Sequence, residues 1–300
     1  MASVSAWLTA FRLNTLPLSI STIIMGSFLA AYQHQFNGVV TTVAMITTLF
    51  LQILSNLAND YGDAESGVDN HDRLGPKRGL QAGTISKKNM KKAIVIFILL
   101  SLISGIYLVI EGTKGVQLSY SLLLFLVGVG AIIAALKYTM GKNPYGYSGF
   151  GDLFVFIFFG LVGVLGTYFL HTHQLPVKEF LPAISMGCFS TGVLNLNNLR
   201  DRVNDAAFNK RTIVVKLGLQ NAKYYHAILL SIGMLSAIIF TVLTPASAWK
   251  WLYLIAFIGI IRSIVIVMKN VEPKTLEPEL KKLALSTLLF SILFGVGLLL

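Results

Sequence analysis

The sequence predicts an all-α integral membrane protein with nine transmembrane helices. Of its 300 residues, 55% are hydrophobic and only 12% are charged, and the mean hydropathy is +0.72. A soluble domain of this length would carry about a quarter charged residues. The apolar residues also gather into segments close to the roughly 20 residues that cross a bilayer. We therefore expect residues 1–300 to form a single polytopic membrane domain.

Nine apolar segments are long enough to be spans. They cover residues 15–34, 39–58, 93–111, 118–138, 151–171, 179–198, 225–244, 250–268 and 283–300. The sixth is the weakest candidate, because Asn195, Asn197 and Asn198 close it. The N-terminus lacks the basic segment and small-residue cleavage pattern of a signal peptide, so we expect the first span to be retained.

Lys and Arg residues predict the orientation. If the N-terminus is inside, 20 basic residues fall at the N-terminus or after spans 2, 4, 6 and 8, against Lys114, Lys178 and Lys250 on the other side. Basic residues concentrate in cytoplasmic loops. We then expect two acid-rich active-site loops, about 59–92 and 199–224, to lie on the cytoplasmic side. Because the basic residues sort into these loops, the net charge of +11 does not indicate nucleic-acid binding.

The first row of polar residues closes the second span. Asn56, Asn59, Asp60 and Asp63 recur with a spacing that places them on one helix face. Carboxylates at the mouth of a membrane helix are costly unless they face water, a metal or a partner. The row is therefore a candidate functional site.

A second row closes the sixth span. Asn197, Asp201 and Asp205 follow one another at intervals of four residues, which again places them on one helix face. The spacing of Asn56 and Asp60 recurs in Asn197 and Asp201, a weak repeat signal. Both rows end even-numbered spans on the same side, so they could face each other across one cavity.

Two facing carboxylate rows flanked by Lys and Arg suit a diphosphate bridged by divalent metal. Magnesium takes oxygen ligands and shares its shell with substrate phosphates. Carboxylates alone would repel a diphosphate, so metal ions must lie between them. Neither row has His or Cys at zinc-ligand spacing, and the single cysteine, Cys188, excludes a disulfide within the chain.

The motifs resemble those of a known family. NDYGD at 59–63 with Asp69 and Asp72–Arg73, and NNLRDRVND at 197–205 followed by KRTIVVKLG, resemble the UbiA superfamily of intramembrane prenyltransferases. The longer run from Asn56 to Gly79, with YTMGKNPYGYSGFGD at 138–152, is similar to the 1,4-dihydroxy-2-naphthoate polyprenyltransferases of menaquinone biosynthesis. The resemblance covers nearly the whole chain. The commonest first motif is NDxxDxxxD, but Gly67 stands where its last acid would be, and Asp69 follows two residues later.

The resemblance implies transfer of a polyprenyl group from polyprenyl diphosphate to 1,4-dihydroxy-2-naphthoate, with loss of carbon dioxide and diphosphate, to give demethylmenaquinol in the bacterial cytoplasmic membrane. Asn59, Asp60, Asp63, Asp201 and Asp205 would hold two Mg²⁺ ions, the four aspartates being catalytic. The implied diphosphate-binding group comprises Asn56, Asp69, Arg73, Lys77, Arg78, Asn197, Lys210 and Arg211. The implied group for the aromatic acceptor or the prenyl cation comprises Arg12, Tyr138, Tyr145, Tyr147 and Asp152.

Other interpretations remain open at the level of the sequence. Arg73, Lys77 and Arg78 could simply follow the basic bias of cytoplasmic loops, and Tyr145 and Tyr147 could belong to an interfacial aromatic belt. The acceptor could be 4-hydroxybenzoate or another phenol. A secondary transporter is the alternative from a different functional class.

Overall fold

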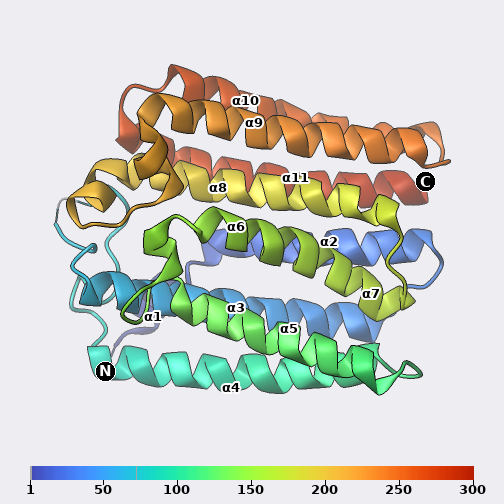
Figure 1. Ribbon diagram of the computed structural model, residues 1–300, viewed down its shortest axis with the longest axis horizontal. Coiled ribbons are helices and arrows are strands. Elements are labelled where there is room, and N and C mark those ends of the chain that lie inside the picture. The colour runs from blue at the N-terminus through green and yellow to red at the C-terminus, as the bar shows by residue number, and fades with distance from the viewer. Residues whose placement is uncertain (1, 72) are drawn as a thin grey trace.

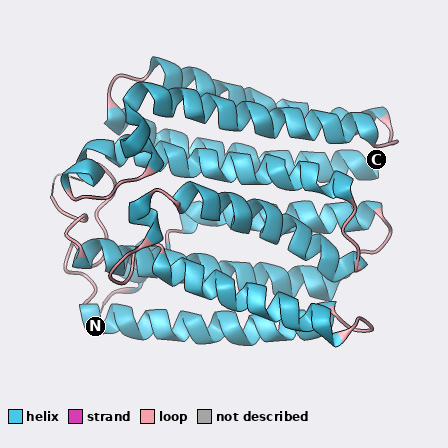
Figure 2. Ribbon diagram, in the orientation of Figure 1, coloured by secondary structure: helices cyan, strands magenta, loops and turns pink. Residues whose placement is uncertain are grey.

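The computed structural model describes residues 2–71 and 73–300, and these residues form helices joined by loops, with no strand among them (Figure 2). Asp72, part of the first sequence motif, lies outside the described residues. The helices run side by side along one long axis, in alternating directions (Figure 1).

In chain order, the helical elements of the described residues are α1 (Val4–Phe11), η1 (Leu13–Thr15), α2 (Leu16–Tyr32), α3 (Gly38–Glu65), α4 (Lys87–Gly112), α5 (Leu118–Lys137), η2 (Tyr145–Ser148), α6 (Gly151–Val155), η3 (Phe156–Gly166), α7 (Thr167–Thr172), η4 (Val177–Glu179), α8 (Phe180–Ala207), α9 (Ile213–Leu243), η5 (Ala248–Trp251), α10 (Leu254–Lys269), η6 (Pro273–Leu276) and α11 (Glu277–Leu299). α6, the π-helical η3 and α7 follow one another directly and form one continuous segment.

Each of the nine predicted spans corresponds to one long helical segment of the described chain, with differences of one or two residues at several ends. Eight of these segments are long and apolar enough to cross a membrane, which makes the chain an integral membrane protein. The remaining segment is α8, whose polar end lowers its hydropathy, and it is the span that the sequence marked as weakest.

The predicted loop boundaries were wrong, because the helices continue past the apolar residues. α3 runs on to Glu65, α8 to Ala207, and α9 begins at Ile213. Much of the regions predicted as loops at 59–92 and 199–224 is therefore helical. Hydropathy detects only the apolar part of a helix, whereas these helix ends carry charged and polar residues.

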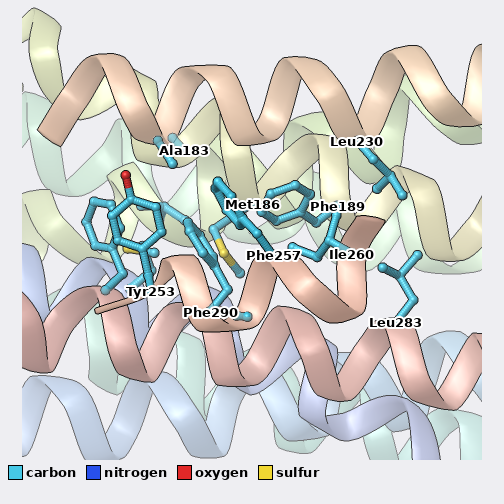
Figure 3. Close-up of a cluster of buried hydrophobic side chains, with 14 of the residues drawn as sticks. Ala183, Met186, Phe189, Leu230, Tyr253, Phe257, Ile260, Leu283 and Phe290 are labelled. Carbon is cyan, nitrogen blue, oxygen red and sulfur yellow. The ribbon is translucent and has the colours of Figure 1, made fainter. Parts of the chain in front are cut away.

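Two hydrophobic clusters hold the bundle together. The larger joins α2, η3, α8, α9, α10 and α11 around buried residues such as Met186, Phe189, Tyr253 and Phe290 (Figure 3). The smaller joins α1, α3, α4 and α5 around residues such as Leu57. Both clusters are built from side chains of long helices, so the helix ends are held in fixed positions.

A glycine in the first motif fixes the end of α3. A Cβ added at Gly62 would lie 2.5 Å from the backbone oxygen of Thr139. Thr139 Oγ1 also donates a hydrogen bond of 3.0 Å to the Ala58 carbonyl. Only a residue without a side chain permits this approach, which places the segment after α5 directly against the acidic end of α3.

Candidate active site

The acidic ends of α3 and α8 lie at the same end of the bundle, as the sequence predicted (Figure 1). The loop that follows α3 crosses to α8 and is fastened there. Asn204 Nδ2 donates to the Val68 carbonyl at 2.9 Å, and Asn70 Nδ2 donates to Asn204 Oδ1 at 2.9 Å. Both rows are thereby held across one site.

Two carboxylates on α3 are buried and paired with guanidinium groups. Asp60 is 1% exposed and Asp63 is 0% exposed. Arg12, in the turn after α1, forms an ion pair with Asp60 Oδ1. Arg78 Nη1 lies 3.3 Å from Asp60 Oδ1 and donates to Asp63 Oδ2 at 2.8 Å. Both acids of the NDYGD motif thus point to one cation from the following loop.

Asp63 also contacts the other half of the bundle. The Tyr147 hydroxyl donates to Asp63 Oδ1 at 2.7 Å. Lys210 Nζ lies 3.4 Å from both oxygens of Asp63 and 3.8 Å from Asp205 Oδ1. Lys210 therefore links the first acidic row to the second. Burial, together with the neighbouring Asp63 carboxylate, raises the pKa of the Tyr147 hydroxyl above its ordinary value, so it remains a donor.

Asp69 follows two residues after Gly67, which stands where the commonest motif has its last acid, and the Asp69 side chain faces cations of the same loop. Asp69 Oδ2 lies 3.3 Å from Arg78 Nη1, and Asp69 Oδ1 lies 3.4 Å from Arg73 Nε. Burial raises the pKa of the Asp69 carboxyl. Burial alone would lower the pKa of Arg78, but the surrounding carboxylates raise it above its ordinary value. Arg78 therefore stays charged.

On α8, the Asp201 carboxylate accepts two hydrogen bonds from its sequence neighbour Arg200. Arg200 donates through Nε to Asp201 Oδ1 at 2.8 Å and through Nη2 to Asp201 Oδ2 at 2.5 Å. Arg200 Nη2 also donates to Asn197 Oδ1 at 2.9 Å, and Nη1 pairs with Glu277 at the start of α11. Arg73 Nη2 lies 3.5 Å from Asp201 Oδ2. Arg200 fixes the orientation of two residues of the second row.

The donor set fits a hard divalent cation. Asn59 Oδ1 and Asp205 Oδ2 are buried without a hydrogen-bond partner within the described structure. A buried unpaired oxygen costs about 1–3 kcal/mol, and a Mg²⁺ ion with its preference for oxygen would remove that cost. Among the described residues, no group of three His, Cys, Asp or Glu side chains is arranged to hold a metal ion directly. Arg78 and Lys210 lie between the carboxylates instead.

A cavity of about 390 Å³ extends from this polar end into the bundle. Its polar end is lined by Arg12, Asn59, Arg78, Asn197 and Lys210. The remainder is lined mainly by apolar residues of α2, α3, α4, α5, α6, η3, α7 and α8, with Leu280 of α11. The arrangement suits a ligand with a charged head and a long hydrocarbon tail.

Aromatic rings form one wall of the cavity next to the acidic site. Tyr138, Tyr145, Phe154 and Phe158 all line it. The ring centroids are 5.5 Å apart for Tyr138 and Tyr145, and 4.0 Å apart for the stacked rings of Tyr145 and Phe154. Aromatic faces attract cations within about 6 Å of the ring centre. The wall can therefore stabilise positive charge that develops near the carboxylates.

The other predicted residues lie around this centre or away from it. Asn56 Nδ2 donates to the Phe11 carbonyl at 2.9 Å, so it anchors the chain before α2. Lys77 and Arg211 are exposed. Asp152 is buried, but it is hydrogen-bonded to Tyr225 of α9 and is not among the cavity-lining residues.

Three features of the site were not predicted from the sequence. Arg200 donates hydrogen bonds to Asp201 and Asn197, and Asn204 is hydrogen-bonded to the loop after α3. Phe154 and Phe158 extend the aromatic wall of the cavity. Arg200 and Asn204 both lie within the NNLRDRVND motif, but Arg200 directly precedes Asp201, and adjacent residues of a helix are not expected to contact each other through their side chains. Phe154 and Phe158 resemble ordinary lipid-facing residues in an apolar run.

Comparisons with known proteins agree with these observations. Residues 19–293 match the UbiA prenyltransferase family. The chain is 41% identical over 298 residues to a 1,4-dihydroxy-2-naphthoate octaprenyltransferase of Escherichia coli, and the match covers 99% of this chain and 96% of that protein. It is also 41% identical to the protein of the same name from Haemophilus influenzae, covering 98% and 95% of the two chains.

Solved structures share the fold. The apo structure of a UbiA homolog from Aeropyrum pernix K1 has a TM-score of 0.69 at 17% identity and covers 96% of this chain and 98% of its own. A UbiA homolog from Archaeoglobus fulgidus, bound to GPP and Mg²⁺, has a TM-score of 0.63 at 16% identity, with coverage of 98% and 100%.

Proposed function

Because the chain belongs to the UbiA prenyltransferase family, we infer that it is the enzyme that transfers a polyprenyl group to 1,4-dihydroxy-2-naphthoate, releasing carbon dioxide and diphosphate. The relatives that are 41% identical over nearly the full length carry this activity in their names. The structural observation that carries the assignment is that Lys210 contacts a buried carboxylate of each row, Asp63 and Asp205, and also lines the polar end of the apolar cavity.

The proposed donor site lies between the two rows. Asn59, Asp60, Asp63, Asp201 and Asp205 would hold two Mg²⁺ ions, which supply charge neutralisation for the diphosphate when bound. A Mg²⁺-bound structure of a family member supports the use of this metal. Arg78 and Lys210 line the cavity and are positioned to donate to diphosphate oxygens. Arg73, Lys77 and Arg211 lie in the surrounding loops and are proposed as further contacts.

The chain's own residues then stabilise the separating charges. As the carbon–oxygen bond of the donor breaks, negative charge grows on the diphosphate, where Arg78 and Lys210 can donate to it. The prenyl carbon becomes cation-like beside the aromatic wall that includes Tyr138 and Tyr145. The hydrocarbon tail lies along the apolar part of the cavity, where water is excluded.

The acceptor is proposed to enter on the side of Arg12, whose guanidinium group lines the cavity. The carboxylate of dihydroxynaphthoate can pair with Arg12, which orients the ring toward the prenyl carbon. A ring carbon forms the new bond to the prenyl group, and the carboxylate leaves as carbon dioxide, giving demethylmenaquinol. Tyr147 and Asp152 remain candidates for supporting this step, Tyr147 through its hydrogen bond to Asp63.

We further propose that the site faces the cytoplasm in a bacterial cytoplasmic membrane. The loops at the site end carry most of the basic residues, including Lys87, Lys88, Lys91 and Lys92 at the start of α4. This charge bias is typical of cytoplasmic loops. A water-soluble acceptor and a diphosphate product are both compatible with that side.

The alternatives are less well supported. Transporter sites lie near the bilayer midplane on broken helices, whereas the acids of this chain gather at the ends of α3 and α8. The relatives named above act, by name, on dihydroxynaphthoate, not on 4-hydroxybenzoate.

Acceptor competition tests the proposed function. Purified protein in nanodiscs with Mg²⁺ and one polyprenyl diphosphate should convert dihydroxynaphthoate to a prenylated quinol, with one diphosphate and one carbon dioxide released per turnover. The same preparation should convert 4-hydroxybenzoate far more slowly. Equal or faster conversion of 4-hydroxybenzoate would reject the acceptor, and no turnover with either would reject the enzyme class.

A further inference from the structure

Three carboxylates converge on a single nitrogen of Arg78. Its Nη1 atom lies 3.3 Å from Asp60 Oδ1, 2.8 Å from Asp63 Oδ2 and 3.3 Å from Asp69 Oδ2. The Arg78 side chain is 6% exposed, and the three carboxylates are at most 1% exposed. Asp60 and Asp63 lie on successive turns of α3, and Asp69 lies in the loop that follows α3. The guanidinium nitrogen therefore stands at the meeting point of three anionic oxygens, which is the position a bound cation would take.

The remaining carboxylates of the site are also paired with cations. Asp201 is held by Arg200 and approached by Arg73 at 3.5 Å. Asp205 is approached by Lys210 at 3.8 Å. Together with Asp60, Asp63 and Asp69, five aspartates face five cations, the fifth being Arg12 on Asp60; Glu277, whose side chain is 40% exposed, also pairs with Arg200. The site is close to electrically balanced in this state.

A divalent cation added alone to such a site would be unfavourable. It would bring two uncompensated charges into a buried region, where unpaired charge is costly. It would also need carboxylate oxygens at about 2.0–2.1 Å, and Arg78 Nη1 already occupies the space between them. Binding of the metal therefore requires that Arg78 move away from the carboxylates.

A diphosphate supplies the reason for Arg78 to move. It brings negative charge with the metal, so the site stays close to balanced, and a guanidinium fork binds phosphate oxygens with two parallel hydrogen bonds. Arg78 lines the cavity in which the diphosphate would lie, so a change of side-chain rotamer is enough to transfer it from carboxylates to phosphate.

We propose that Arg78 is a placeholder for the metal: it holds the Asp60, Asp63 and Asp69 carboxylates until metal and diphosphate arrive together, and it then transfers to the diphosphate. The proposal rests on the proposed function and adds a coupling to it. Divalent metal binds weakly without diphosphate, and each ligand strengthens the other, as linkage requires. The device prevents the carboxylates from holding metal in the absence of the donor.

Metal binding, measured without turnover, tests the proposal. The full-length protein in nanodiscs is titrated with Mn²⁺, an oxygen-preferring ion whose free form is detected by electron paramagnetic resonance, with and without inorganic diphosphate. Protein-free titrations correct for the Mn²⁺–diphosphate complex. The variants are Arg78→Gln, Arg78→Lys, and Lys88→Gln as a control, because Lys88 is an exposed cation at the same end of the bundle.

In the wild type, diphosphate should tighten Mn²⁺ binding at least tenfold. Arg78→Gln should bind Mn²⁺ alone at least tenfold more tightly than the wild type and lose most of the coupling. Arg78→Lys keeps the charge and should stay weak for Mn²⁺ alone. Lys88→Gln should match the wild type in both titrations.

Several results would overturn the placeholder role. Equal Mn²⁺ affinity with and without diphosphate in the wild type would do so. So would an unchanged Mn²⁺ affinity in Arg78→Gln, or tight Mn²⁺ binding by Arg78→Lys in the absence of diphosphate. If Arg78→Gln does not fold, the wild type and Arg78→Lys still decide the question. If the wild type transfers the prenyl group but shows no coupling between Mn²⁺ and diphosphate binding, this inference is rejected and the proposed function stands. If the wild type neither binds metal nor transfers the prenyl group, the proposed function is rejected.

Discussion

At the scale of single residues, each aspartate of the candidate site faces at least one Arg or Lys side chain. Asp60, Asp63, Asp201 and Asp205 followed from helical spacing at the ends of two spans, because spacing determines which residues share a helix face. Their cations come from loops and from neighbouring positions, and loop conformation has no comparable periodicity. Arg78, for example, was one of several basic loop residues, and only the fold distinguishes it from the exposed Lys77.

Asp63 offers the sharpest residue-scale prediction. Asp63→Asn keeps the size of the side chain and can still accept the Tyr147 hydrogen bond, but it removes the charge that faces Arg78 and Lys210. Loss of a charge used to bind metal and stabilise the leaving group should lower kcat by about 100-fold or more. Steady-state rates of diphosphate release measure the effect.

Glu65→Gln is the matched control. Glu65 lies on the same helix end, but it is exposed and pairs with Lys87 at 2.6 Å outside the cavity. This variant should retain the kcat and the melting temperature of the wild type. A cooperative melting curve for Asp63→Asn shows that its lower rate belongs to folded protein, even if the loss of a buried ion-pair partner lowers its melting temperature. A near-normal rate in Asp63→Asn would remove Asp63 from the proposed metal site.

At the scale of the elements, the spans were predictable and their ends were not. Hydropathy found nine apolar segments, and each corresponds to a helical segment. Hydropathy could not predict that α8 continues to Ala207 or that α9 already begins at Ile213, since these helical turns are polar and depend on tertiary contacts. Nor does it reveal that residues Phe156–Gly166 are π-helical. This conformation is rare in proteins overall, but where it occurs it is often at a functional site.

The cavity wall formed by α5 allows an element-scale prediction. A Cβ added at Gly128 or at Gly130 meets no atom within 4 Å, so either position should accept a larger residue. Gly128 lines the cavity, and Gly130 is not among its lining residues. Gly128→Leu should therefore fill space needed by the prenyl chain and lower the rate with long polyprenyl diphosphates about tenfold.

Donor length and position separate this effect from a general loss of stability. Gly128→Leu should affect geranyl diphosphate less than a long donor. Gly130→Leu gains the same helix propensity from replacing glycine and should behave as the wild type with both donors. Turnover measured across a series of donor lengths checks this, and equal long-donor rates in the two variants would contradict the proposed path of the tail.

At the scale of the whole molecule, alternating helix directions bring both acidic rows and most basic loops to one end (Figure 1). The count of spans and the distribution of Lys and Arg together predicted this arrangement, because each constrains the other. The cavity, by contrast, depends on how helices far apart in the sequence pack together, and a single sequence carries no direct signal for it.

The orientation leads to a labelling prediction. Cys188 is buried, so Lys88→Cys and Val177→Cys, made in a Cys188→Ser background, introduce single accessible thiols at opposite ends of the bundle. Both positions are exposed. A membrane-impermeant maleimide should label Val177→Cys in intact spheroplasts and Lys88→Cys only in inverted vesicles. The reverse pattern would place the site on the outer side of the membrane.

The central claim is that the carboxylates of α3 and α8 hold the donor diphosphate together through shared divalent ions. A crystal structure with an unreactive polyprenyl diphosphate analogue and Mn²⁺ tests it most directly, because anomalous scattering locates the ions. We expect anomalous peaks between Asp60 or Asp63 on one side and Asp201 or Asp205 on the other, with the diphosphate bridging them. Ions bound to only one helix end, or a diphosphate bound elsewhere, would contradict the account.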